Sequence, residues 1–274
     1  MPALSDGTVL PDIGFGTYPL RGDEATRAVL SALDTGYRLI DSAVNYRNED
    51  AVGRAIARSD VPRDEIIVAT KIPGRDHGFD SALASFDRSA AALGLETIDL
   101  YLIHWPNPSV DKYVDTWRAM VRLQEEGRVR SIGVSNFTAE YLIRVADASG
   151  VMPALNQVEL HPFFPQEKLR AFHAEHGIVT EAWSPLGKAA PVKESKPVTS
   201  AAEAHAVTAA QVVLRWHQQI SSLPIPKSGD PGRQRENFQV SGFTLTDDEV
   251  AAITALGRPD GRLFGGDPET HEEM

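Results

Sequence analysis

The sequence predicts a (β/α)₈ barrel, and three observations carry this prediction. The chain has 274 residues, close to the size of about 250 residues that is typical of single barrels of this class. Short apolar runs alternate along it with longer segments of helical period, and eight such runs can be distinguished. Each run is continuously apolar rather than alternating, as expected of parallel strands that are covered on both faces.

The predicted strands follow one another at intervals that leave room for a helix. They are Ile13–Gly16, Arg38–Asp41, Ile66–Thr70, Leu100–Ile103, Arg130–Ser135, Ala154–Glu159, Ile178–Glu181 and Ser222–Ile225. In the intervals, apolar residues recur at steps of three and four, as at Leu83, Phe86 and Ala90, which is the spacing of one helix face. Gly94 follows that segment and predicts its end, because glycine adopts the left-handed conformation of a helix C-terminus without strain.

An open, doubly wound sheet also fits strands that alternate with helices. A dinucleotide site on that fold needs a Gly-x-Gly-x-x-Gly turn after an early strand. The one early candidate, Gly14–Gly16, continues as Thr-Tyr-Pro-Leu and lacks the third glycine. The closed barrel is therefore the better prediction.

The segments outside the repeat predict no second domain. Asp6-Gly7, between apolar pairs at 3–4 and 9–10, predicts a β-hairpin that closes the bottom of the barrel. Gly187–Ser200 and Arg258–Met274 are rich in turn-forming and charged residues, and we expect a loop and a loop-like tail there. One domain over residues 1–274 follows.

Composition narrows the class of partner. The chain carries 27 basic and 38 acidic side chains, a net charge of −11, whereas a nucleic-acid-binding protein normally has a basic face. No apolar run approaches the length of about 18 residues that spans a bilayer, and the N-terminus lacks the pattern of a secretion signal. The absence of cysteine excludes thiolate chemistry. We expect a cytoplasmic monomer that acts on a small molecule, without a nucleic-acid or membrane partner.

Polar residues follow nearly every predicted strand, at the barrel end that carries the chemistry in this fold. Asp41 and Tyr46 come at and after the second strand, Lys71 after the third and His104 after the fourth. Taken singly, these residues also fit a buried ion pair, a packing aromatic and a core histidine. Taken together, they fit a proton donor to a carbonyl oxygen, because an ammonium group lowers the pKa of a neighbouring phenol and a histidine can orient the carbonyl.

The remaining strand ends suit a bound cofactor. Amide and hydroxyl groups of Ser135, Asn136 and Gln157 could hold a carboxamide, and Trp183 offers a flat face for a ring. Lys227 and Ser228, with Arg233 and Arg235 at the start of the next helix, are typical of an anion site at a helix N-terminus. Since no nucleophilic serine motif or cysteine is present, the group that adds to the carbonyl carbon must come from a cofactor.

Several ordered motifs resemble one family. They are Gly36–Ala43, Gly94–Pro106, Gly133–Phe137, Asn156–Pro162, Trp183–Gly187 and Ile225–Ser228. From Gly14 to about Arg258 the chain resembles the aldo-keto reductases, and within them the bacterial branch that includes the 2,5-diketo-D-gluconate reductases. The resemblance implies a barrel that binds NADPH and reduces an aldehyde or ketone, with no metal.

The resemblance also implies roles for individual residues. Asp41, Tyr46, Lys71 and His104 align with the family's catalytic tetrad, in which Tyr46 is the general acid. The implied cofactor contacts are Ser135, Asn136, Gln157, Trp183, Ser184, Leu186, Lys227, Ser228, Arg233, Glu236 and Asn237. The candidate substrate contacts are Tyr18, Trp105 and Phe264.

Three positions depart from the family pattern. Tyr18 stands where many members have Trp, and Ile72–Gly74 stands where close relatives often carry one, so the substrate pocket differs. Asp230 lies near the implied site for the 2′-phosphate and could weaken the preference for NADPH over NADH. Two other functions are alternatives: a cofactor-sensing subunit on the same fold, and a metal-dependent hydrolase, which would need a His-x-His ligand pair that the first strand lacks.

Overall fold

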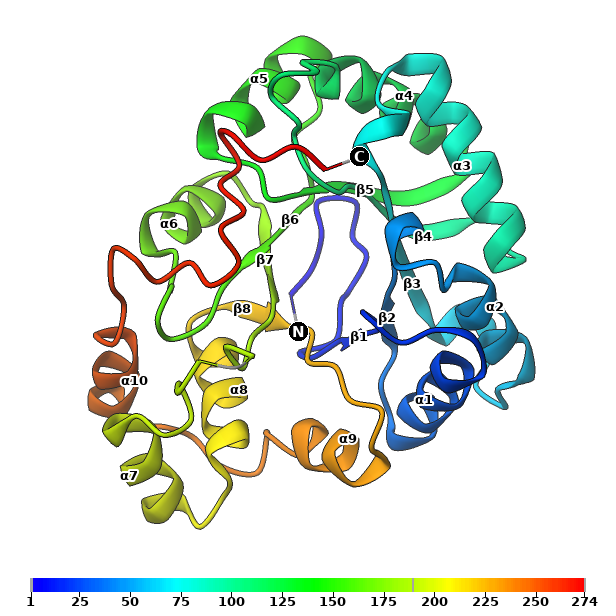
Figure 1. The fold of residues 1–274 in the computed structure, drawn as a ribbon. Coiled ribbons are helices and arrows are strands. Elements are labelled where there is room, and N and C mark those ends of the chain that lie inside the picture. Colours follow the sequence, from blue (N-terminus) through cyan, green and yellow to red (C-terminus); the bar gives the residue numbers. More distant parts are fainter. Residues whose placement is uncertain (1, 189, 274) are drawn as a thin grey trace.

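Eight parallel strands form the closed barrel that the sequence predicts (Figure 1). The computed structural model describes residues 2–188 and 190–273. The strands neighbour one another in chain order from β1 to β8. The ring closes where the backbone N–H groups of Gly14 and Gly16 donate to the carbonyl oxygens of Pro224 and Pro226, at 3.0 and 3.1 Å.

The elements alternate as the periodicity predicts. The strands are β1 (Phe15–Gly16), β2 (Leu39–Asp41), β3 (Ile67–Ile72), β4 (Ile98–Ile103), β5 (Val129–Ser135), β6 (Leu155–Glu159), β7 (Val179–Trp183) and β8 (Ser222–Pro224). The α-helices are α1 (Gly22–Thr35), α2 (Glu49–Arg58), α3 (Phe79–Leu93), α4 (Tyr113–Glu125), α5 (Ala139–Ser149), α6 (Glu167–Glu175), α7 (Lys196–His205), α8 (Ala209–Gln219), α9 (Pro231–Phe238) and α10 (Asp247–Thr254). Three single turns of 3₁₀ helix are η1 (Val44–Tyr46), η2 (Arg63–Glu65) and η3 (Gly74–Asp76).

Glycines end the helices where the chain must turn back toward a strand. Gly94 follows α3 at a φ of 66°, as the sequence predicts. Gly36 follows α1 at a φ of 119°, and a Cβ atom there would lie 2.8 Å from the ring of Phe238. Gly36 therefore allows both the left-handed turn and the close approach of Phe238 at the end of α9.

The two-residue period of the strands explains why polar groups gather at one barrel end. Side chains at alternate positions, such as Leu39, Ile67 and Leu102, form the buried cluster inside the barrel, whereas Ile40 and Val68 belong to the larger cluster beneath the helices. Following the inward positions along each strand leads from apolar residues to polar ones at the C-terminal end. The core thus lies below the site and the polar layer above it.

The bottom of the barrel is closed by the predicted hairpin. Ala3 and Val9 form an antiparallel bridge, and Leu4 and Leu10 are buried in the cluster inside the barrel. Asp6 in the turn accepts a hydrogen bond from the Ser131 hydroxyl of β5. Figure 1 shows this segment within the ring of strands.

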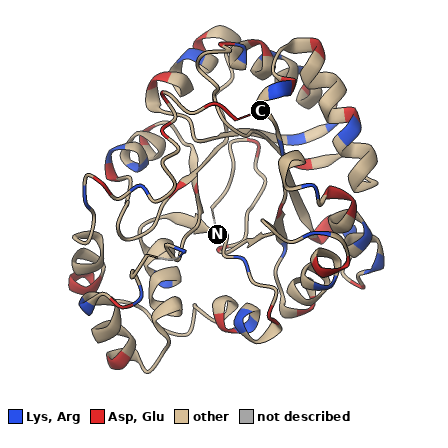
Figure 2. Ribbon diagram, viewed as in Figure 1, with Lys and Arg blue, Asp and Glu red and all other residues tan. Residues whose placement is uncertain are grey.

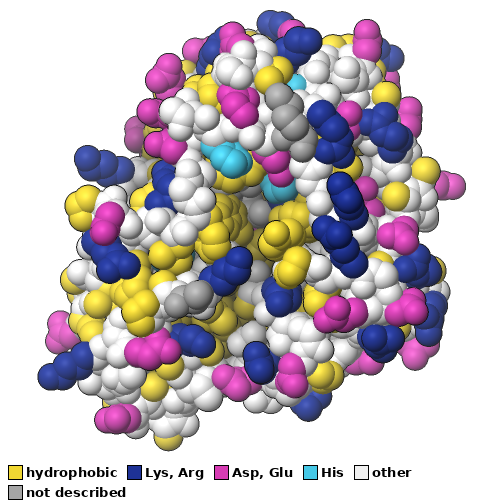
Figure 3. Space-filling view, in the orientation of Figure 1, with side chains coloured by type: hydrophobic (Ala, Val, Ile, Leu, Met, Phe, Trp, Pro, Cys, Tyr) yellow, Lys and Arg dark blue, Asp and Glu magenta, His cyan; other side chains and the backbone are white. Residues whose placement is uncertain are grey.

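Two segments differ from a plain loop and tail. The predicted loop at 187–200 is helical from Lys196, where Pro197 lies in the first turn of α7, a position that suits proline because the first N–H groups of a helix lack partners within the helix. The tail after α10 runs back across the ends of β6, β5 and β4 (Figure 1). In Figure 3 the same face is hollowed at its centre, with apolar side chains and several Lys or Arg side chains around the hollow.

Charged side chains lie mainly on the outer helices, where both signs are mixed (Figure 2). Within the described residues, no helix is long and apolar enough to cross a membrane.

Candidate active site

Four predicted residues come together at the C-terminal end of the strands. Lys71, near the end of β3, places its Nζ 2.5 Å from Oδ1 of Asp41 at the end of β2, and 3.4 Å from the hydroxyl of Tyr46 on η1. His104 directly follows β4, and its ring centroid lies 5.6 Å from that of Tyr46. Asp41 and Lys71 are inward positions of adjacent parallel strands, which explains why residues 30 apart in sequence meet.

Lys71 is completely buried, yet the site keeps it charged. Its Nζ also donates to the carbonyl oxygen of Ser42 at 2.9 Å. Burial is the largest influence and lowers the pKa of Lys71, but the charge of Asp41, the hydrogen bond to Asp41 and the other acidic groups nearby together outweigh burial, and the net pKa lies above its ordinary value. The ammonium group therefore persists at neutral pH beside the phenol.

The sequence predicted that Lys71 lowers the pKa of Tyr46. The charge of Lys71 does act in that direction, but the prediction is wrong for the overall pKa, which is raised. Burial raises the pKa of Tyr46 to about 12, although the Lys71 charge lowers it, and Asp41 raises it further. The reason is that a buried phenolate loses its hydration, and the charge of Lys71 is largely offset by Asp41 close by. Tyr46 is accordingly protonated at neutral pH and can donate its proton.

A second buried acidic side chain, Glu181, joins this group through Gln157, and the sequence did not predict it as a site residue. The side-chain amide of Gln157 on β6 donates to Oδ1 of Asp41 at 2.8 Å and to Oε2 of Glu181 on β7 at 2.7 Å. Burial raises the pKa of Glu181 to about 8. The available signal was an acidic residue inside the apolar run of the seventh strand, since such residues are rarely buried without a partner.

The residues predicted to contact a carboxamide form one connected network. The Ser135 hydroxyl donates to the backbone oxygen of Gln157 at 2.9 Å, and Nδ2 of Asn136 donates to the Ser135 hydroxyl at 3.0 Å. The indole N–H of Trp183 donates to Oδ1 of Asn136 at 2.8 Å. This bond holds the Trp183 ring at the rim while its side chain remains partly exposed. Ser184 and Leu186 follow it in the same loop and are also partly exposed.

The predicted anion site lies at the start of α9. Lys227 and Arg233 are exposed and Ser228 is buried. Asp230 is the N-cap of α9, and its Oδ1 accepts the backbone N–H of Arg233 at 2.8 Å. That carboxylate therefore occupies a backbone donor at the helix N-terminus.

The last two implied cofactor contacts, Glu236 and Asn237, differ in their surroundings. Glu236 accepts a hydrogen bond from the Thr208 hydroxyl at 2.8 Å. Asn237 is buried, with 6% of its surface exposed. The carboxylate of Glu236 is thus partly engaged by the segment before α8.

Aromatic side chains border the group around Tyr46. The Tyr18 ring centroid lies 5.1 Å from that of Tyr46, and Tyr18 is 54% exposed. Phe264 lies with its ring centroid 5.3 Å from that of Trp183. Tyr18 thus packs on the candidate acid, and Phe264 packs on the indole of Trp183.

The C-terminal tail, which supplies the predicted substrate contact Phe264, also reaches the site through two residues that the sequence did not single out, His271 and Glu273. His271 packs on Trp105, with ring centroids 4.2 Å apart. Oε1 of Glu273 lies 3.0 Å from Nδ1 of His104. Upstream, the backbone N–H of Leu263 donates to the buried carboxylate of Glu159 on β6 at 2.6 Å. Tail composition alone predicted only a loop, since these contacts depend on the closed barrel.

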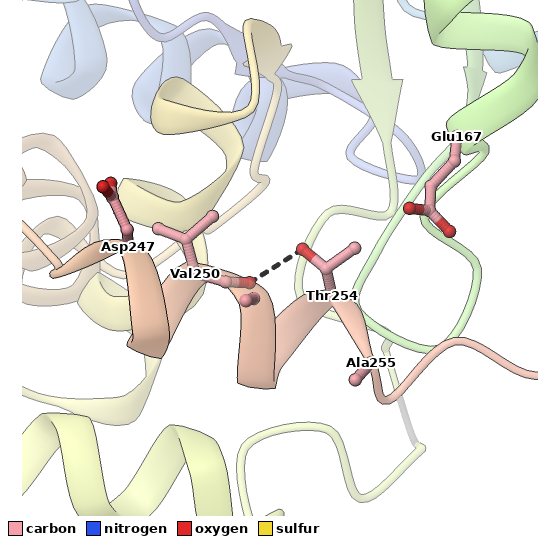
Figure 4. Close-up of a pocket in the computed structure, with 6 residues that line it drawn as sticks. Glu167, Asp247, Val250, Thr254 and Ala255 are labelled. Atoms are coloured by element: carbon pink, nitrogen blue, oxygen red, sulfur yellow. Dashed lines mark hydrogen bonds between the residues drawn. The ribbon is translucent and has the colours of Figure 1, made fainter.

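A separate hollow lies far from this group. It has a volume of about 510 Å³ and lies between Glu167 of α6 and one face of α10. In Figure 4 the Thr254 hydroxyl donates to the backbone oxygen of Val250, and the carboxylates of Glu167 and Asp247 lie at opposite ends of the group of side chains drawn. No polar groups converge there among the side chains drawn, so the strand ends remain the candidate site.

The Aldo/keto reductase family matches residues 12–258 of the chain. The chain belongs to this family. It is 58% identical to 2,5-diketo-D-gluconic acid reductase B of Corynebacterium sp. (strain SHS752001), over 99% of this chain and 98% of that protein. The predicted family and barrel fold are thereby confirmed.

Solved structures agree. The aldo/keto reductase from Brucella melitensis is 50% identical, with a TM-score of 0.89 over 92% of this chain and 97% of that one. A variant of the protein Gox0644 in complex with NADPH is 45% identical, with a TM-score of 0.94 over 98% of this chain and 97% of that one.

Proposed function

We propose that this aldo-keto reductase uses NADPH to reduce aldehydes and ketones to alcohols, with Tyr46 as the proton donor. Small dicarbonyl and sugar-derived compounds fall within this substrate class. The observation that carries the proposal is a protonated phenol 3.4 Å from a buried ammonium group, next to a histidine, at the open end of the barrel. The family and a structural neighbour in complex with NADPH support the choice of cofactor.

The residues present fit such a cofactor. Both N–H bonds of the Gln157 amide are directed to carboxylates, which leaves its carbonyl oxygen to accept from a carboxamide N–H. Trp183, fixed by Asn136, offers a ring face. Lys227 and Arg233 supply exposed positive charge for a phosphate, and the guanidinium fork of Arg233 matches two phosphate oxygens.

Residues of this chain supply the proton that the carbonyl oxygen needs. The cofactor, when bound, supplies a hydride to the carbonyl carbon. Tyr46 donates its phenolic proton to the carbonyl oxygen, so that the two electrons of the hydride and one proton give the alcohol. Lys71 stabilises the phenolate that Tyr46 becomes, and Asp41 holds Lys71 in place. His104 orients the carbonyl oxygen toward the phenol.

Replacing Tyr46 by Phe tests the proposal. We expect the reduction rate of 4-nitrobenzaldehyde to fall at least about a hundredfold, because loss of a positioned general acid typically costs 10²–10⁴-fold. Binding of NADPH, followed by quenching of tryptophan fluorescence, should persist. As a matched control, Tyr101→Phe alters a buried tyrosine whose ring packs on Phe86 outside the barrel interior, and it should keep the wild-type rate.

Two results would contradict the proposal. A Tyr46→Phe variant with more than half the wild-type rate would exclude Tyr46 as the acid. A wild-type protein that binds NADPH but turns over no aldehyde would favour the cofactor-sensing subunit instead.

A further inference from the structure

The tail brings a carboxylate into contact with the candidate histidine. Besides the 3.0 Å approach of Glu273 to Nδ1 of His104, the backbone oxygen of Glu273 accepts from the Asn107 amide at 2.5 Å. A Cβ atom on Gly74 would lie 1.9 Å from that same oxygen. The loops after β3 and β4 thus hold residue 273 closely, and the position of its carboxylate is set by more than one contact.

Further contacts hold the residues just before Glu273. The carboxylate of Glu272 accepts the backbone N–H of Ser109 at 2.7 Å, and His271 packs on Trp105. The last described turn of the tail is therefore anchored to the loop that follows His104. Glu272 and Glu273 are neighbours, but only Glu273 contacts the histidine.

The Glu273 carboxylate is negatively charged although it is largely buried. Burial raises its pKa, but the contact with His104 and the charge of Lys71 lower it, and the net pKa lies below the ordinary value. The charge also reaches Tyr46, whose pKa it raises. A carbonyl group that contacts both Tyr46 and His104 must therefore lie close to this charge.

Of two positive groups near this carboxylate, Lys71 is paired with an opposite charge, whereas Arg75 is bonded to a neutral amide and keeps its charge. Lys71 pairs with Asp41 at 2.5 Å, and the guanidinium group of Arg75 donates to Oδ1 of Asn45 at 2.5 Å. The neighbouring carboxylate, Glu272, is held by the backbone N–H of Ser109 and does not contact His104. A substrate whose own carboxylate lies near Tyr46 and His104 would consequently lie close to the Glu273 carboxylate in a partly desolvated site, where like charges repel more strongly than in water.

We infer that Glu273 is a specificity-determining residue that selects neutral carbonyl compounds over anionic ones. The inference rests on the proposed function and narrows its substrate class.

A matched pair of aldehydes tests the inference on the full-length protein with NADPH. The two substrates are 4-formylbenzoate, which is an anion at pH 7, and its uncharged methyl ester. The quantity measured is the ratio of kcat/KM for the ester to kcat/KM for the anion. Both aldehydes need the same Tyr46 and His104, so the ratio isolates the effect of charge.

In Glu273→Gln we expect this ratio to fall about tenfold relative to wild type, a size in keeping with one like-charge repulsion at a partly buried site. Glu272→Gln is the matched control. It removes the neighbouring carboxylate, which caps Ser109 instead of contacting His104, and should leave the ratio much closer to the wild-type value. The midpoint of thermal unfolding of each variant shows whether the fold is kept.

Three results would overturn the inference. An unchanged ratio in a folded Glu273→Gln protein would show that its charge does not select substrates. An equal gain for both aldehydes would mean that the tail obstructs every substrate regardless of charge. If the wild-type protein turned over neither aldehyde, the proposed function itself would be refuted. This outcome is distinguishable from the other two because it is observed without any variant.

Discussion

Replacing Lys71 by Met should destabilise the protein as well as slow it, because it breaks a buried ion pair. The side chain of Lys71 is 0% exposed and that of Asp41 is 3% exposed. Removing one partner leaves the other charge buried and uncompensated, which typically costs about 3–5 kcal/mol of unfolding free energy. For a chain of this size, that corresponds to a fall of roughly 6–20 °C in Tm.

The pair of variants provides the sharper test. Lys71→Met, Asp41→Asn and the double variant are unfolded in urea while tryptophan fluorescence is followed, and their rates with 4-nitrobenzaldehyde are measured. We expect the double variant to be more stable than the sum of the single losses predicts, by about 0.5–3 kcal/mol, since neither charge is then left alone. The losses in rate should be non-additive as well, because both residues act through Tyr46. Additive losses in stability and in rate would refute the reasoning.

Three further changes give distinct expectations. Arg233→Ala should weaken NADPH binding roughly ten- to hundredfold, because a contact to a charged group contributes about 1.5–3 kcal/mol. Fluorescence titrations should show nearly unchanged NADH binding in the same variant. Equal losses for both cofactors would exclude a phosphate contact. Asp230→Asn should strengthen the preference for NADPH while keeping the α9 N-cap. Asp230→Ala removes the cap and should also lower the stability measured by urea unfolding. Weaker NADPH binding in both variants would show that the carboxylate does not repel the phosphate. Burial raises the pKa of the Glu181 carboxyl group from an ordinary 4.5 to about 8. The folded protein therefore binds the carboxyl proton more tightly than the unfolded chain does. As a result, the free energy of unfolding should fall as the pH rises from about 4.5 to about 8. Glu181→Gln should flatten that fall, and an unchanged pH profile would contradict the buried position of Glu181.

Much of the fold and the list of candidate residues could be predicted from local signals in the sequence. Eight apolar runs separated by helical periods specify strands buried on both faces, and Asp6-Gly7 specifies a hairpin, because each pattern acts over a few residues. Asp41, Lys71 and His104 could be found as the polar residues at strand ends. The roles of the residues around Lys227 and Arg233 came from motif resemblance, since their spacing alone also suits a solvated surface.

The tertiary structure alone decided the energetic balance within the site. The pKa of Tyr46 depends on how far burial outweighs Lys71, and burial is a property of the closed barrel rather than of the motif. The contact of Gln157 with Glu181 depends on the register of β6 against β7, in which the two residues are partners. Asp230 proved to be a helix cap because its carboxylate reaches the N–H group of Arg233. Glu273 lies at the far end of a tail without periodicity, and it meets His104 because the barrel brings residues 169 positions apart to one rim.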